Sequence, residues 1–365
     1  MAVLGTRPEV VKLAPILHEL KRHPKSFKVD LVWTGQHVEL ARPFLKLFEL
    51  KHDHFLNIMK PNQTLADIVA GVSVKLSTLI ARLRPDILMV QGDTTTAMIA
   101  ALCAYQAKVK VAHIEAGLRS FNKYHPFPEE KNREIISHLS DLNFAPTNVS
   151  KKNLLREGTD PKTIHVVGNS VVDALHWLLK KYPSPQGGEG KGEGENEKLL
   201  LVTAHRRESF GEPLKNICKA LLTLAKRHAD LQIIYPVHPN PNVRKVVYKM
   251  LGGRKNIKLI EPLEYLPFIH LLSQCSVALS DSGGVQEEAP CLGKPVLIMR
   301  EVTERPEGVK AGASKLVGRD TNKIIRAVEG LLYNPRNYTK MARVRYPFGR
   351  GDTAIRVVSI LKKVV

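Results

Sequence analysis

Short apolar runs alternate with amphipathic helical patterns along the chain, and this alternation constrains the fold more than any other feature. In segment 9–22, for example, Val10, Ala14 and Leu17 recur at the spacing of one helix face. Alternating strands and helices predict an α/β protein with parallel sheets covered on both faces. The expected strands are 2–4, 29–33, 87–90, 109–114, 142–145, 164–167, 199–203, 233–237, 257–260, 277–279 and 296–299.

The chain has 365 residues, which is more than one ordinary hydrophobic core requires. We therefore expect two Rossmann-like domains facing a cleft. The N-terminal domain is expected to cover 1–169 and to be joined by a C-terminal helix, 353–365. The C-terminal domain is expected to cover 170–352, with the Gly/Glu-rich stretch 187–198 as a loop before its sheet.

Composition narrows the classes of function. The formal net charge of +20 favours anionic partners, but no block of five like charges occurs and no nucleic-acid-binding signature accompanies it. We therefore expect a phosphorylated small substrate and no nucleic acid. No apolar run of about 18 residues is present, so no membrane partner is expected. Four scattered cysteines and an N-terminus without a signal-peptide layout indicate a cytoplasmic protein without a zinc site.

Acidic residues follow two of the expected strands. Asp93 follows the run 87–90 after Gln91 and Gly92, and Glu115 directly follows the run 109–114. Ligands of a doubly wound sheet bind beyond the carboxyl ends of its strands, so these two carboxylates and Glu129 are candidates for acid–base chemistry. The alternatives remain open at this stage: Asp93 as a helix N-cap, Glu115 paired with Arg119, and Glu129 in an acidic first turn of a helix.

Three turns have the composition of phosphate sites. Gly5-Thr6-Arg7-Pro8-Glu9 joins a strand to a helix, and free amides at the helix start would bind an anion. Asp281-Ser282-Gly283-Gly284 opens a helix in the same way. A third segment follows a strand and contains three basic residues: Ala204-His205-Arg206-Arg207-Glu208. The alternatives are a plain turn with solvated charges, a helix N-cap at Asp281 or Ser282, and a surface charge cluster.

Eight motifs occur in order along nearly the whole chain: Gly5-Thr6-Arg7-Pro8-Glu9, Gly35-Gln36-His37, Gly92-Asp93-Thr94-Thr95-Thr96, His113-Ile114-Glu115-Ala116-Gly117-Leu118-Arg119, Pro128-Glu129-Glu130, Ala204-His205-Arg206-Arg207-Glu208, Asp281-Ser282-Gly283-Gly284-Val285-Gln286-Glu287-Glu288-Ala289 and Thr303-Glu304-Arg305-Pro306-Glu307. Taken together, they resemble the non-hydrolysing UDP-N-acetylglucosamine 2-epimerases. The resemblance implies a glycosyltransferase-B-like fold, a homodimer, and action on UDP-N-acetylglucosamine without metal, nicotinamide or other cofactor.

The resemblance also implies roles for individual residues. The catalytic candidates are Asp93, Glu115, Glu129 and His205. The candidates for binding UDP or the sugar are Arg7, Lys12, Arg133, Phe268, Ser282, Gly283, Gly284, Glu288 and Arg305. A second site, which activates bacterial members, would involve Gln36, His37, Gln63 and His238. Because Gly71 stands where an arginine is expected, we do not expect substrate activation here.

Three other functions compete with this interpretation. A glycosyltransferase would share the fold and the UDP site but needs an acceptor. A hydrolysing epimerase would release free N-acetylmannosamine. A nucleic-acid-binding protein would use the excess of positive charge and bind with a steep dependence on salt.

Overall fold

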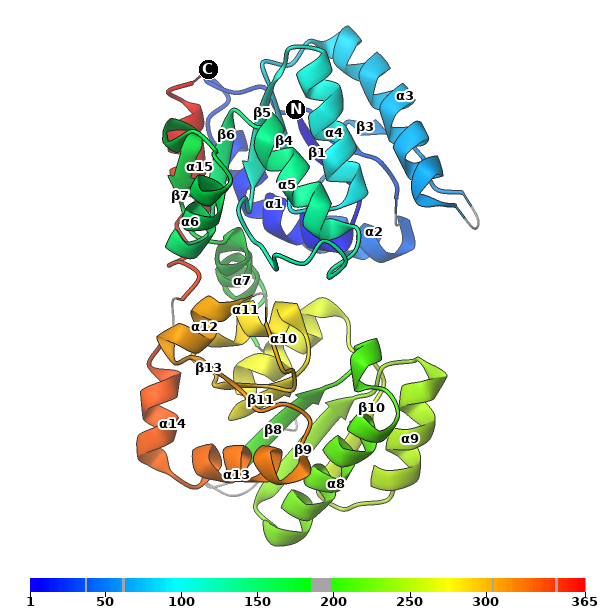
Figure 1. The fold of residues 1–365 in the computed structure, drawn as a ribbon, viewed down its shortest axis with the longest axis vertical. Helices are drawn as coiled ribbons and strands as arrows, with labels where there is room; N and C mark the ends of the chain where they lie inside the picture. Colours follow the sequence, from blue (N-terminus) through cyan, green and yellow to red (C-terminus); the bar gives the residue numbers. More distant parts are fainter. Residues whose placement is uncertain (37, 61–62, 185–197, 304, 345–346, 365) are drawn as a thin grey trace. The chain divides into compact units, whose positions relative to one another are not determined.

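The structure is a computed structural model, and it describes residues 1–36, 38–60, 63–184, 198–303, 305–344 and 347–364. The chain divides into two compact units, Met1–Trp177 with Gly349–Val365, and Leu178–Phe348 (Figure 1). The division falls inside helix α7 (Ser170–Lys181), whereas the boundary drawn from the sequence lies at the start of this helix. Most of the Gly/Glu-rich stretch 187–198 lies outside the described residues.

The first unit is built on a sheet of seven parallel strands in the order β3-β2-β1-β4-β5-β6-β7. The strands are β1 (Ala2–Leu4), β2 (Leu31–Trp33), β3 (His54–Phe55), β4 (Ile87–Gln91), β5 (Lys110–Ile114), β6 (Leu142–Ala145) and β7 (Ile164–Val166). The helices are α1 (Arg7–Lys21), α2 (Val38–Leu47), α3 (Leu65–Leu83), α4 (Thr95–Gln106), α5 (Glu129–Leu139), α6 (Asn148–Arg156), α7 and α15 (Thr353–Leu361), with a 3₁₀ turn at Pro161–Thr163. Helices α3, α4 and α5 pack side by side along the sheet (Figure 1).

The second unit contains six parallel strands in the order β10-β9-β8-β11-β12-β13. They are β8 (Lys198–Thr203), β9 (Leu231–Pro236), β10 (Ile257–Ile260), β11 (Val277–Ser280), β12 (Val296–Ile298) and β13 (Ser314–Leu316). The helices are α8 (Glu212–Arg227), α9 (Pro241–Leu251), α10 (Tyr265–Gln274), α11 (Gly283–Cys291), α12 (Pro306–Ala311), α13 (Thr321–Leu332) and α14 (Pro335–Ala342), with a 3₁₀ turn at Arg207–Ser209.

Both sheets reverse their strand order at one place. In the first unit the chain builds outward from β1 to β3 and then from β4 to β7 on the other side, so β1 and β4 are neighbours. In the second unit β8 and β11 are neighbours for the same reason. Such switch points leave a crevice at the carboxyl ends of the two central strands, where ligands of doubly wound folds bind.

Each unit has its own core. Val3, Leu88, Val90 and Val111 are fully buried strand residues of the first sheet. The fully buried strand residues of the second sheet include Leu200, Ile233, Leu279 and Leu297.

The C-terminal helix α15 packs on α1 and is held by α7, because Asp173 Oδ1 accepts a hydrogen bond of 2.9 Å from the Ala354 amide. The last helix of the chain therefore completes the first unit.

Candidate active site

Asp93 lies at the carboxyl end of β4, where it is bound to an arginine of α5. Strands β4 and β5 pair in register up to Gln91 and Ile114, so the turns that follow them are adjacent. The Asp93 carboxylate accepts hydrogen bonds from Arg133, at 3.0 Å from Nε and also from Nη2. Asp93 is not the N-cap of α4, because Thr94 occupies that position and accepts from the Ala97 amide at 3.0 Å. That alternative for Asp93 is therefore wrong.

Glu115 lies at the end of β5 and is surrounded by donors from three other segments. Lys12 Nζ is bound to Glu115 Oε2, which also accepts from Asn169 Nδ2 at 2.8 Å. Gln91 Nε2 donates to Glu115 Oε1 at 3.0 Å. The alternative pairing with Arg119 is wrong, because Arg119 forms a two-bond ion pair with Glu157 at 2.7 Å. Lys12, a substrate-binding candidate, is here a partner of Glu115.

Glu129 and its neighbour Glu130 form the first turn of α5, as the alternative for these residues predicted. Burial raises the pKa of the Glu129 carboxyl, and the charge of Asp93 raises it further, while Arg133 acts in the opposite direction. Glu129 thus differs from Asp93 and Glu115, each of which is paired with a cation. A carboxyl with a raised pKa beside ion-paired carboxylates is the arrangement that separates an acid from a base.

Glu130 was not selected as a site residue from the sequence, yet it connects the loop before α5 to Arg133. It is fully buried, and Oε1 accepts the amides of Ser120 and Phe121 at 2.8 and 2.7 Å. Its Oε2 accepts from Arg133 Nη1 at 2.9 Å. Arg133 therefore bridges Glu130 and Asp93.

The turn after β1 carries a carboxylate where an anion site was expected. Glu9 Oε2 accepts the amides of Gly5 and Thr6 at 2.8 and 2.6 Å. These two amides are therefore already bonded within the protein. The side chain of Arg7 is exposed, with its guanidinium 5.6 Å from the centre of the Phe44 ring.

His113 on β5 is a second residue that sequence reasoning missed. Its Nε2 lies 2.7 Å from the carbonyl oxygen of Gly92, the residue before Asp93. Burial lowers the pKa of His113 to about 4, so the neutral ring donates this hydrogen bond at neutral pH. The signal available in the sequence was a polar residue inside the apolar strand pattern 109–114.

In the second unit, His205 and Asp281 meet at the switch point between β8 and β11. Thr203 and Ser280 pair in register, so the turns that follow them are adjacent. His205 Nδ1 lies 3.1 Å from Asp281 Oδ1, and the His205 and Arg206 amides both donate to Oδ2 at 3.0 Å. Nothing is described of the Arg207 side chain.

The start of α11 combines two glycines with an arginine. Ser282 is the N-cap residue, and its side chain makes no capping bond. A Cβ added to Gly283 would lie 2.8 Å from Arg305 Nη1, so the guanidinium sits directly against the helix start. Arg305 Nε donates to Glu287 at 2.6 Å. This grouping of Gly283 and Arg305 has the composition of an anion site.

Two further binding candidates lie on α10 and α11. Glu288, nearly buried, accepts a hydrogen bond of 2.9 Å from the Tyr265 hydroxyl. Phe268 is half-buried on α10, and Gly284 follows Gly283 with Glu288 one turn further on.

The candidate regulatory residues are divided between the two units. Gln36 is buried and accepts from Thr96 Oγ1 at 2.5 Å, beside the β1 turn. Gln63 accepts from the Lys60 amide at 2.9 Å, and His37 lies outside the described residues. His238 is in the second unit, where its ring stacks on His205 with centroids 5.7 Å apart.

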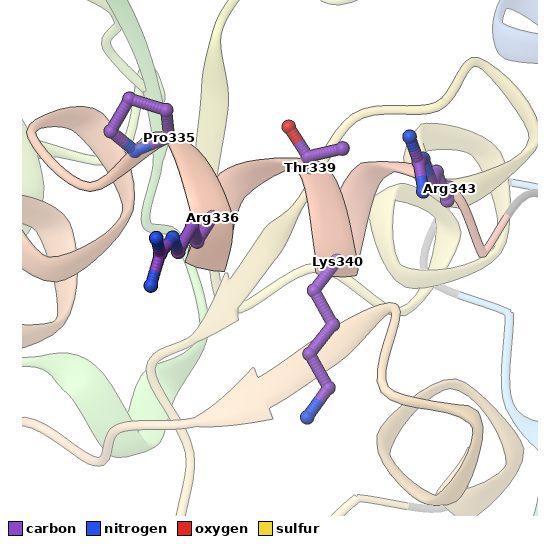
Figure 2. A pocket seen from close by; sticks show the side chains of 5 residues that line it. All are labelled: Pro335, Arg336, Thr339, Lys340 and Arg343. Carbon is purple, nitrogen blue, oxygen red and sulfur yellow. The ribbon is translucent and has the colours of Figure 1, made fainter.

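A surface hollow of about 550 Å³ lies along α14 and contains none of the candidate residues. Figure 2 shows its lining side chains, which are Pro335, Arg336, Thr339 and Lys340 of α14 and Arg343 at its C-cap. Within the described ranges, no group of three or more His, Cys, Asp or Glu residues is arranged to hold a metal ion. None of the helices in the described part combines the length and hydrophobicity needed to span a bilayer.

Two parallel sheets, each with charged residues at its switch point, define an α/β protein of glycosyltransferase-B-like fold. The family model for UDP-N-acetylglucosamine 2-epimerase matches residues 18–362. The chain belongs to this family of isomerases.

Comparisons with individual proteins agree with this family assignment. The UDP-N-acetylglucosamine 2-epimerase of Escherichia coli K12 is 44% identical over 99% of this chain and 98% of its own length. A crystal structure of the Neisseria meningitidis UDP-GlcNAc 2-epimerase bound to UDP-GlcNAc has a TM-score of 0.90 and 46% identity, covering 99% of each chain. The glycosyltransferase of kitacinnamycin has a TM-score of 0.66 at 11% identity, covering 99% of this chain and 98% of that one, which shows the fold alone.

Proposed function

We propose that this protein converts UDP-N-acetylglucosamine reversibly into UDP-N-acetylmannosamine by inverting C2. The observation that carries the proposal is the set of three carboxylates, Asp93, Glu115 and Glu129, at the ends of β4 and β5 and the start of α5. Family membership and the relative bound to UDP-GlcNAc support the choice of substrate.

The chemistry of the sugar explains why several carboxylates are needed. C2 has no adjacent carbonyl, so its proton is not acidic. Loss of UDP from C1 creates an oxocarbenium-like centre and makes the C2 proton labile. Removal of that proton gives 2-acetamidoglucal and UDP. Addition of UDP to C1 and of a proton to the other face of C2 then gives the epimer.

The first unit contains the groups that suit the sugar chemistry. Asp93 and Glu115 are carboxylates next to a developing positive charge, and each can also accept a proton. The raised pKa of Glu129 supports its role as the group that holds a proton before C2 is reprotonated. Arg133 and Lys12 keep the carboxylates in place and can exchange partners when the substrate binds.

We assign the nucleotide to the second unit. Ser282, Gly283, Gly284 and Arg305 suit the diphosphate, because they combine helix amides with a guanidinium. Glu288 suits the ribose hydroxyls as an acceptor, and Phe268 would stack on the base. His205 is assigned to the departing UDP, where an imidazolium can donate a proton to the leaving oxygen. Arg7 adds an exposed cation for the phosphates.

The wider setting is proposed on chemical grounds. The product would supply N-acetylmannosamine units for cell-surface polysaccharides, and the enzyme would act as a homodimer without a cofactor. We propose a cytoplasmic location, because the four cysteines are free thiols buried in the protein.

Proton NMR of the purified protein with UDP-N-acetylglucosamine in heavy water tests the proposal. We expect UDP-N-acetylmannosamine carrying deuterium at C2, with no acceptor added. Free N-acetylmannosamine as the main product would indicate the hydrolysing reaction instead. Turnover only with an added sugar acceptor would indicate a glycosyltransferase, and product that keeps the original C2 proton would contradict exchange with solvent.

A further inference from the structure

Asp281 is a fully buried carboxylate in the turn after β11. Oδ2 accepts the amides of His205 and Arg206 and the Ser209 hydroxyl, each at 3.0 Å. Oδ1 lies 3.1 Å from His205 Nδ1, and it also accepts the His205 amide at 3.2 Å. Oδ2 therefore accepts three of the hydrogen bonds that hold the turn after β8, while Oδ1 is the oxygen that faces the histidine ring.

The contact at Oδ1 decides which ring nitrogen carries hydrogen. Burial alone would raise the pKa of Asp281, but the bonds and charge of His205 and the two amides outweigh it and leave the pKa below its ordinary value. Asp281 is therefore ionised at neutral pH. An ionised carboxylate is only an acceptor, so His205 Nδ1 must be the donor. The other ring nitrogen, Nε2, is then the one left for a ligand.

The neighbouring histidine does not compete for this contact. His238 stacks on His205 with an angle of 19° between the rings, and its own Nδ1 accepts from the Asn240 amide at 3.2 Å. Stacking fixes the plane of the His205 ring, and Asp281 fixes its rotation within that plane.

We propose that Asp281 is a positioning residue: it keeps hydrogen on His205 Nδ1, so that Nε2 is the nitrogen that takes up a proton and gives it to the leaving oxygen of UDP. The proposal rests on the role given to His205 above. Asp281 itself is buried, and no contact with the substrate is assigned to it. It does not cap α11 either, since Ser282 occupies that position.

Asp281→Asn separates the two tasks of this carboxylate. The three donors at Oδ2 require an oxygen there, so the amide nitrogen of the variant must take the place of Oδ1. That nitrogen would donate to His205 Nδ1 and force the hydrogen onto Nε2. The turn keeps its three bonds at Oδ2 and loses only the longer contact of the His205 amide with Oδ1, at 3.2 Å, so the variant should fold. Ser209→Ala is the matched control, because it removes one donor at Oδ2 and leaves the ring contact intact.

The tautomer can be measured by ¹⁵N NMR on protein labelled at its 14 histidines. His205→Asn identifies the signals of His205 by their loss. We expect Nδ1–H in the wild type and in Ser209→Ala, and Nε2–H in Asp281→Asn. For Asp281→Asn, kcat for UDP-N-acetylglucosamine should fall by about 10²-fold, the scale of one acid–base group, with KM little changed.

Each outcome bears on the proposal separately from the proposed function. A wild-type signal of Nε2–H, or an unchanged tautomer in Asp281→Asn, would overturn the positioning role even if the protein is an active epimerase. A switched tautomer with kcat within about twofold of the wild type would overturn its catalytic importance. Full activity of His205→Asn would instead refute the role assigned to His205.

Discussion

Glu9 on α1 accepts a hydrogen bond of 2.6 Å from Thr94 Oγ1, so one buried carboxylate ties the turn after β1 to the turn after β4. The same side chain binds the amides of Gly5 and Thr6. These two turns flank the switch point of the first sheet and carry Arg7 and Asp93. The distance between the two turns is therefore set by a side chain of the protein, Glu9.

Replacing Glu9 should therefore affect stability in a graded way. Glu9→Ala leaves two amides unsatisfied, and we expect a loss of about 1–3 kcal/mol for a buried polar group without its partner. Glu9→Gln keeps an oxygen for the amides and can donate to Thr94 through its nitrogen, so its loss should be less than about 1 kcal/mol. Urea denaturation of the three proteins gives both differences. Equal losses for the two variants would contradict this account.

The stability of the wild type should also depend on pH through Glu9. Burial raises the pKa of this carboxyl, so the native state holds the proton more tightly than the unfolded chain does. The contribution of Glu9 to the free energy of unfolding is therefore greatest below the ordinary carboxyl pKa and declines as the pH rises into the raised range. Denaturation of wild type and Glu9→Gln at a series of pH values isolates this effect. As the pH rises, the free energy of unfolding of the wild type should fall relative to that of Glu9→Gln.

The ion-paired carboxylates should be required for the chemistry and not for nucleotide binding. We expect Asp93→Asn and Glu115→Gln to lower kcat by about 10²-fold or more, while calorimetry still detects UDP. Groups that act as a unit are not additive, so the double variant should be little worse than the poorer single one. Asp67→Asn, at an exposed position in the first turn of α3, is a control for the same substitution. If both site variants react at the wild-type rate, these carboxylates are only ion-pair partners.

Glu288 should act mainly in binding. Its proposed contact with the ribose exists in the ground state and the transition state alike, so Glu288→Ala should raise KM and the Kd for UDP while kcat changes little. Tyr265→Phe removes the hydroxyl that donates to Glu288 and should weaken UDP binding to a smaller extent. Calorimetry with UDP and steady-state kinetics measure both effects. A kcat defect at an unchanged Kd would assign Glu288 to the chemical step.

The kinetics should show no activation by the substrate. With Gly71 in place of the expected arginine, we predict a hyperbolic dependence of rate on UDP-N-acetylglucosamine and a reverse reaction without a lag. Gly71 has room for a side chain, since an added Cβ would lie 3.4 Å from the Ile58 Cβ. Gly71→Arg is therefore the variant in which activation should be sought. A strict requirement of the wild type for added UDP-N-acetylglucosamine in the reverse reaction would contradict the prediction.

The sequence predicted the central strands of both sheets because they are buried on both faces and read as apolar runs. It missed β3 and β13, since His54–Phe55 and Ser314–Leu316 are too short and too polar to form such runs. Asp93 and Glu115 could be placed together because parallel strands bring their carboxyl ends to one edge.

The partners of these residues could not be predicted in the same way. The Glu9 contact with Thr94 joins residues 85 positions apart, and Asn169 reaches Glu115 across 54 positions. His205 and Asp281 are 76 positions apart along the chain. Local patterns contain no information about such pairs, which depend on how turns from different strands meet.

The place of α15 has a consequence for how the protein is made. The first unit is discontinuous: the chain leaves it at Trp177 and returns at Gly349, after the whole of the second unit. During synthesis from the N-terminus, the second unit is available as one continuous stretch while the first still lacks the helix that Asp173 holds against α7. The unit that begins first is thus the last to be finished, and a nascent chain stopped before residue 353 would expose the surface of α1 that α15 covers.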